Sequence, residues 1–275
     1  MPNFGYHFAR WRGKVVRTLY RIFLPAIVRQ HLKTDRSIPF PVVAYSNEAM
    51  LPEQVASIRS FLRYAGRPRK FTVVSDGSHS AKSLELLQKI DPCVVVANLP
   101  KDDAAPDRYT SYLRNHPTGK QLALIMALPQ KEPVLYMDAD VLFFPGAEKL
   151  GEIATTSAPA LYLADCQFSG DERLVRDAAE MRDPVNTGVL FLRQKLDWEL
   201  SVARFRELPG EPVFFTNQTM THLTMHRNGA QPLDRAKYVL QLDDQFEGAD
   251  RYASPGIVLR HYVNPVRHKF WTSLR

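Results

Sequence analysis

Beyond residue 39, short apolar runs alternate with segments in which apolar residues recur every three or four positions. These two patterns predict strands at 41–45, 71–74, 93–96 and 134–137, and helices at 52–64, 81–90 and 119–128. The polar stretch 101–117 predicts a loop. Short buried strands that alternate with helices are typical of a parallel or mixed sheet covered on both faces. We therefore expect an α/β fold, with one domain over 37–275.

The first 36 residues interleave basic and apolar residues, and we expect them to form an N-terminal extension. They contain eight Lys and Arg and one Asp, so they carry the whole net charge of +7. Pro25 predicts a kink or an end of the helix at that point. A basic amphipathic helix with aromatic residues is typical of attachment to an anionic membrane surface. Packing on the rest of the chain, RNA binding and docking to a partner are the alternatives.

Composition argues against several other classes of protein. The two cysteines form neither a disulfide framework nor a zinc motif, which indicates a reducing compartment. No segment has the roughly 18–20 apolar residues of a membrane span. Residues 37–275 are neutral, whereas a nucleic-acid groove needs a basic surface across the fold. We expect a cytoplasmic protein that binds no nucleic acid and lies peripherally at the inner face of the membrane.

The segment 133–145, PVLYMDADVLFFP, places two carboxylates between two apolar runs. A lone buried carboxylate is costly, so these acids must be paired, protonated or bound to a metal. In an extended segment residues i and i+2 point to the same side, so Asp138 and Asp140 can converge on one cation. Oxygen ligands of this kind suit Mg²⁺ or Mn²⁺. The alternative is that Asp138 only caps a turn.

Polar residues also lie at the predicted carboxyl ends of strands, where ligands bind in such sheets. Ser46 and Asn47 follow the first strand, at the same edge as the two acids. Neither a Gly-x-Gly-x-x-Gly motif nor a phosphate loop follows that strand, which disfavours the usual dinucleotide and P-loop mechanisms. Asn186 precedes Thr-Gly and an apolar strand, where glycine lets the backbone approach a ligand closely. A turn that opens the strand is the alternative, and this segment alone favours it.

Two further segments carry polar groups. Asn217 and Gln218 open a predicted helix, where they can bind sugar hydroxyls or simply cap the helix. The C-terminal segment 261–271, HYVNPVRHKFW, contains histidines and cations that suit a metal and a phosphate. A solvated tail is the alternative for this segment.

Together these motifs resemble the GT-A-fold glycosyltransferases, most closely the retaining family that includes glycogenin and bacterial lipopolysaccharide galactosyl- and glucosyltransferases. The resemblance extends over about residues 42–271. YMDAD, which ends at Asp140, is similar to that family's metal motif. The segment that begins at Asn186 is similar to its sugar-binding motif, and the segment that begins at His261 is similar to its closing motif. The resemblance implies a mixed, mostly parallel sheet flanked by helices, and His261 as the third metal ligand beside Asp138 and Asp140.

The resemblance also implies how a sugar donor would be held. Ser46 and Asn47 would contact the nucleoside, and Lys120 would reach the donor. Arg267 or Lys269, or both, would contact the diphosphate. The closing motif of the family usually has its lysine six residues after the histidine, a place that Arg267 occupies here.

The implied reaction is transfer of a hexose from a nucleotide diphosphate sugar, expected to be a UDP-sugar, to a hydroxyl of a glycan or lipid-linked acceptor. The cofactor would be Mn²⁺ or Mg²⁺, and Asn186 and Gln218 would orient the sugar. Asn217 stands where the family often has aspartate, so front-face substitution with retention is the favoured mechanism. A sugar nucleotidyltransferase and a catalytically silent binding protein at the membrane are the alternative functions.

Overall fold

The computed structural model describes residues 4–32, 34–99, 107–129 and 131–274. Its helices are α1 Phe4–Ile27, α2 Leu51–Tyr64, α3 Ala81–Gln88, α4 Arg108–Asn115, α5 Pro117–Met126, α6 Glu199–Arg206, α7 Thr216–Arg227 and α8 Arg267–Ser273, with 3-10 helices η1 Glu48–Met50, η2 Pro145–Thr155, η3 Glu172–Leu174 and η4 Ala178–Met181. Its strands are β1 Ser37–Ile38, β2 Val42–Ser46, β3 Arg67–Pro68, β4 Phe71–Ser75, β5 Val94–Asn98, β6 Val134–Asp138, β7 Val141–Phe143, β8 Ala160–Ala164, β9 Val185–Leu192, β10 Gln231–Pro232, β11 Tyr238–Val239 and β12 Leu259–His261.

A central seven-stranded sheet has the order β10-β8-β9-β6-β2-β4-β5. Strands β6, β2, β4 and β5 are parallel, whereas β9 runs antiparallel to both β6 and β8. A small sheet of order β11-β12-β7 lies beside it, with β7 antiparallel to β12. The mixed, mostly parallel sheet flanked by helices confirms the predicted α/β class.

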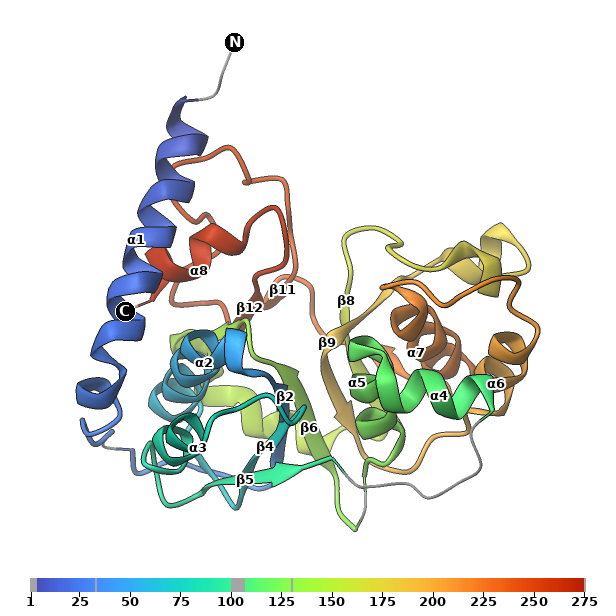
Figure 1. The fold of residues 1–275 in the computed structure, drawn as a ribbon, viewed down its shortest axis with the longest axis horizontal. Coiled ribbons are helices and arrows are strands. Elements are labelled where there is room, and N and C mark those ends of the chain that lie inside the picture. Colours follow the sequence, from blue (N-terminus) through green and yellow to red (C-terminus); the bar gives the residue numbers. More distant parts are fainter. Residues whose placement is uncertain (1–3, 33, 100–106, 130, 275) are drawn as a thin grey trace.

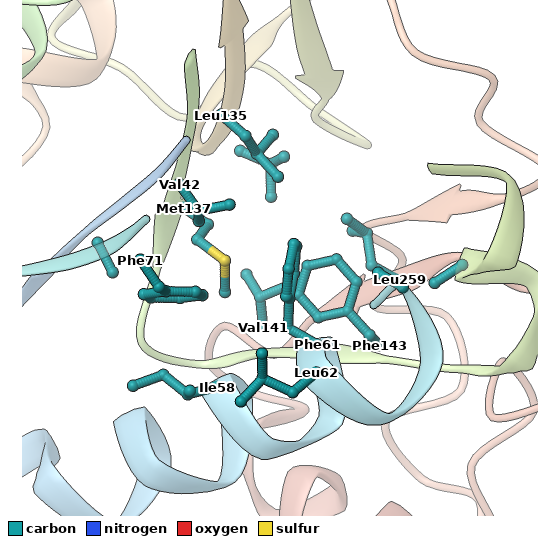
Figure 2. Packing of buried hydrophobic residues seen from close by; sticks show 14 of the residues in the cluster. Val42, Ile58, Phe61, Leu62, Phe71, Leu135, Met137, Val141, Phe143 and Leu259 are labelled. Carbon is teal, nitrogen blue, oxygen red and sulfur yellow. The ribbon is translucent and has the colours of Figure 1, made fainter. Parts of the chain in front are cut away.

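Helices cover the central sheet on both faces, with α2 and α3 on one side and α4 to α7 on the other (Figure 1). Figure 2 shows Phe61 of α2 among Phe71 of β4 and Phe143 of β7, with ring centroids 5.6 and 4.9 Å from that of Phe61. All three rings are buried, and truncating such a ring to alanine costs about 3–5 kcal/mol. This packing holds β7, and through it β12, against the sheet.

The predicted loop at 101–117 is wrong in its second half. Residues 100–106 lie outside the described part of the chain, but residues 108–115 form α4. The Asp107 carboxylate accepts a hydrogen bond from Thr110 N (2.7 Å), and Thr110 Oγ1 accepts one from Asp107 N (2.8 Å). This capping box satisfies backbone donors at the helix start, so a segment with many polar residues still forms a helix.

The N-terminal helix α1 lies along α8 and α2 (Figure 1) and ends two residues after Pro25. Its inner face carries the buried Leu24 and the glycine Gly13, where an added Cβ would lie 2.6 Å from the His268 carbonyl oxygen. Arg17 pairs with the buried Glu53 of α2. The predicted extension therefore packs on the rest of the chain. None of the helices over the described residues is long and apolar enough to cross a membrane.

Candidate active site

Three side chains converge beyond the carboxyl end of β6. Asp138 ends β6, Asp140 lies two residues later before β7, and His261 ends β12, opposite Val141 of β7. His261 Nε2 lies 3.0 Å from Asp140 Oδ1 and 3.8 Å from Asp138 Oδ2. One ligand atom from each residue lies within 4.8 Å of the others, so the group can hold a metal ion. The structure thus brings together the three residues predicted to bind metal.

The electrostatics of this cluster suit a divalent cation. Burial raises the pKa of Asp138 to about 6, against the lowering effect of His261. Burial alone would also raise the pKa of Asp140, but His261 and Arg267 lower it to about 2. Burial lowers the pKa of His261, yet Asp140 and Asp138 raise it overall. A partly buried and a buried carboxylate therefore lie next to the positively charged His261 and Arg267, and a divalent cation could take over part of this charge compensation.

The orientation of the His261 ring is set by strand β9. His261 Nδ1 lies 2.9 Å from Asn186 Oδ1, an oxygen that also accepts a hydrogen bond from Gly188 N. Because Oδ1 is an acceptor, His261 Nδ1 carries a proton, and Nε2 faces the carboxylates, where a second proton bonds to Asp140 or a metal would take that proton's place. A Cβ on Gly188 would lie 2.2 Å from His261 Cε1. The sequence predicts that a ligand comes close to the backbone at Gly188, and in the structure the His261 ring takes that position.

Amide side chains connect the cluster to helices α5 and α7. Gln121 Nε2 donates to Asp138 Oδ1 (2.8 Å), and its Oε1 accepts from Asn217 Nδ2 (2.9 Å). Asp165 Oδ2 accepts from Asn186 Nδ2 (3.1 Å) and lies 3.4 Å from Gln218 Nε2. The structure therefore brings Asn186, Asn217 and Gln218 together at one site, where each bonds to other protein groups.

Sequence reasoning missed Gln121 and Asp165. Asp165 directly follows the apolar strand β8, which is the same signal that identified Asp138. Gln121 lies one position after Lys120 in a helix that was predicted correctly, and no local motif marks it. Only the folded structure shows that Gln121 bonds to Asp138 and Asn217.

A cavity of about 380 Å³ surrounds these groups. It is lined by Thr118, Gln121, Asp138, Asp140, Asp165, Gln167, Ser169, Asn186, Thr187, Phe214, Phe215, Asn217, Gln218, Leu242, His261, Val263, Asn264 and Arg267. Most of these side chains are polar, and the rings of Phe214 and Phe215 are exposed. A polar cavity with aromatic rings at its edge is suited to a hydroxyl-rich ligand.

Arg267 lines this cavity, and its guanidinium bonds to Asp140 Oδ2 (2.6 Å). Lys269 does not line it: its buried ammonium bonds to Asp244 Oδ2 (3.1 Å) and to the Ala249 carbonyl (2.6 Å). The expected contact of Lys269 with a diphosphate is therefore corrected. Lys269 stands two residues after the place where the family usually has its lysine. Its side chain belongs to a buried ion-pair cluster in which Asp244 also pairs with Arg260.

Ser46, Asn47 and Lys120 also lie outside the residues that line this cavity. Ser46 is buried at the end of β2, and Asn47 caps η1 by accepting a hydrogen bond from Met50 N (3.0 Å). Their contact with a nucleotide stays a prediction.

No protein-family model matches the chain, and no curated protein sequence matches it significantly. Among solved structures, the galactosyltransferase LgtC in complex with donor and acceptor sugar analogues has a TM-score of 0.57 at 14% identity, covering 86% of this chain and 95% of that chain. The bifunctional glycosyltransferase WbbM has a TM-score of 0.57 at 13% identity, covering 90% and 50%. Apo GlyE of Streptococcus pneumoniae TIGR4 has a TM-score of 0.56 at 14% identity, covering 86% and 60%.

These similarities show that the chain has the GT-A fold of these glycosyltransferases, as its motifs implied. It spans nearly all of LgtC but only half of WbbM.

Proposed function

We propose that this protein is a glycosyltransferase that moves a hexose from a nucleotide diphosphate sugar, expected to be a UDP-sugar, to an acceptor hydroxyl. The observation that carries the proposal is the cluster of Asp138, Asp140 and His261 within a polar cavity at the carboxyl end of the sheet. When bound there, Mn²⁺ or Mg²⁺ would neutralise the charge on the leaving diphosphate. The GT-A fold supports this reading.

The residues around the cluster have distinct roles in this proposal. Arg267 is partly exposed on the cavity wall and can turn from Asp140 toward a diphosphate, where its planar fork would pair with two oxygens. Asn186 bonds to His261, Gln218 bonds to Asp165, and the two amides would orient the sugar. Asn217 is an amide, which favours front-face substitution with retention over an intermediate covalently bound at that position.

Titration of Mn²⁺ with UDP by calorimetry tests the site. Asp138→Ala and Asp140→Ala should each weaken metal-dependent binding by about 100-fold or more, since each removes a ligand. Glu132→Ala, which removes an exposed carboxylate paired with Arg69, is the control and should bind normally. Unchanged binding in both ligand variants would refute the assignment.

Turnover assays separate this function from its alternatives. Incubation with UDP-sugars and sugar acceptors should release UDP in proportion to glycosylated product. Diphosphate release from a sugar 1-phosphate and a nucleoside triphosphate would instead identify a nucleotidyltransferase. Donor binding without either product would identify a silent binding protein.

We further propose that α1 attaches the protein to an anionic membrane surface, where a lipid-linked acceptor would be found. Its outer face carries an exposed apolar stripe at helical spacing, formed by Phe4, Phe8, Trp11, Val15, Leu19, Ile22 and Phe23. Basic residues on either side of such a stripe add about 1 kcal/mol each near anionic lipid. The exposed rings and the surrounding positive charge match such a surface.

Co-sedimentation with anionic vesicles at low and high salt tests this attachment. Because Leu24 of α1 belongs to the core, deletion of the helix would also destabilise the fold. Trp11→Ser with Leu19→Ser should therefore be used to reduce vesicle binding in the full chain. Absence of binding by the unaltered protein at any salt concentration would refute the membrane role.

A further inference from the structure

A second cavity, of about 370 Å³, lies between α1 and the segment that leads into α8. It is lined by Tyr6, Arg10, Gly13, Lys14, Arg17, Glu53, Asn264, Pro265, Arg267, His268 and Trp271. The residues contributed by α1 recur at helical spacing, so one side of that helix faces the cavity. The exposed apolar stripe of α1 lies on a different side of the helix, since its residues are out of phase with those that line the cavity.

The cavity has an excess of positive charge. Four of its lining side chains are cations, Arg10, Lys14, Arg17 and Arg267, and one is a carboxylate, Glu53. The carboxylate is used by Arg17, which bonds to both of its oxygens (2.5 and 3.0 Å). Within the described part of the chain, no carboxylate lies within ion-pair distance of Arg10 or Lys14. These two cations are therefore available to an anion.

Arg10 is held in place by its surroundings. Its guanidinium lies 5.4 Å from the centroid of the Tyr6 ring, and Tyr6 packs edge-on against His268 (5.5 Å between centroids). A guanidinium held over an aromatic ring keeps its N–H groups free to donate. The Arg10 guanidinium therefore lines the cavity with N–H groups that can donate to a ligand.

This cavity adjoins the candidate active site. Asn264 and Arg267 line both cavities, and Arg267 bonds directly to Asp140 of the metal cluster. An anion among Arg10, Lys14 and Arg267 would therefore lie one side chain away from the metal cluster.

We propose that this cavity binds a phosphate group of the acceptor, and so that the acceptor is a phosphorylated lipid or a phosphorylated glycan. The inference rests on the proposed glycosyltransferase function. Phosphate fits best because it accepts charge-assisted hydrogen bonds from several arginine and lysine donors at once. Binding here would place the rest of the acceptor toward the cavity that Arg267 shares with the metal cluster.

Calorimetric titration of the full chain without metal tests the proposal, with glycerol 3-phosphate and dihexanoyl phosphatidic acid as probes. Arg10→Gln with Lys14→Gln should weaken binding of either probe by about tenfold or more. Arg12→Gln with Arg21→Gln is the matched control, because it removes the same charge from exposed positions on the same helix outside the cavity. Lys14→Arg, which keeps the charge, should retain binding.

The outcomes separate the possible sources and the possible failures. Equal affinity for both probes indicates recognition of the phosphate alone, and tighter binding of the lipid probe indicates a lipid-linked acceptor. Failure of the unaltered protein to bind either probe, or equal losses in the two double variants, would overturn the proposal. A parallel titration with Mn²⁺ and UDP reports on the donor site. Its failure alone would overturn the proposed function, and with it the identity of the ligand as an acceptor, but would leave phosphate binding in this cavity in place.

Discussion

Replacing Gly188 with alanine should disable the metal site without changing any ligand. The added Cβ would lie 2.2 Å from His261 Cε1, 2.4 Å from His261 Nδ1 and 2.8 Å from Asn186 Oδ1, whereas ordinary contacts begin at 3.4 Å. The imidazole must therefore retreat by more than about 1 Å, while metal–ligand distances tolerate only about 0.2 Å. Loss of one ligand should weaken metal binding by at least about 10–100-fold, or about 1.4–2.7 kcal/mol.

The fold should survive this change, because overpacking a core position costs about 1–3 kcal/mol and a typical domain has more stability than that. Calorimetric titration of Mn²⁺ with UDP measures the effect, and thermal denaturation checks the fold. Gly256→Ala is the control, since a Cβ there meets nothing within 4 Å. If the effect passes through His261, adding Gly188→Ala to His261→Ala should cost no further affinity. A folded Gly188→Ala protein with unaltered Mn²⁺ affinity would refute the reasoning.

Lowering the pH should weaken Mn²⁺ binding by more than about tenfold per unit below pH 6, because protons compete for two ligands. The pKa of Asp138 is raised to about 6, and the pKa of His261 is raised by the two carboxylates. Titrations across this range should show the fall, and a flat profile would contradict it. Arg260→Met should lower the free energy of unfolding by about 3–5 kcal/mol, because it removes one of the cations that pair with the buried Asp244. Arg69→Met, which breaks an exposed ion pair, should cost less than about 1 kcal/mol, and urea denaturation of both variants measures the difference. Burial raises the pKa of Asp171, but its bond to Arg173 lowers it overall, so Asp171 should stabilise the fold above pH about 4 and lose this contribution as the pH falls further. Denaturation curves between neutral pH and about pH 2.5 should be less pH-dependent for Asp171→Asn, and an identical dependence would exclude this role.

The strands and the metal motif could be predicted because their signals are local. The four residues before Asp138 are apolar and buried and form most of β6, as expected for a strand buried on both faces. The i, i+2 spacing of Asp138 and Asp140 places both carboxylates beside the same imidazole. The capping box at Asp107 is local as well, but the polar composition of its segment predicts a loop, so the sequence-based prediction omits α4.

Partners of long side chains could not be predicted in the same way. The sequence offered Arg267 and Lys269 as equivalent cations, but α8 directs one toward Asp140 and the other into the cluster around Asp244. Gln121 lies 17 positions before Asp138 and carries no motif, and only the approach of α5 to β6 brings them together.

The order of apolar and polar residues by itself determined the α/β class, the strand that ends at Asp138, and the basic amphipathic character of α1. These properties follow from hydrophobic periodicity, which acts within a few residues. Tertiary structure decided which face of α1 is buried against α8 and which is exposed, that His261 and Asn186 meet, and that two cavities share Arg267. These contacts join residues far apart in the chain, so they depend on how the sheet and helices pack together.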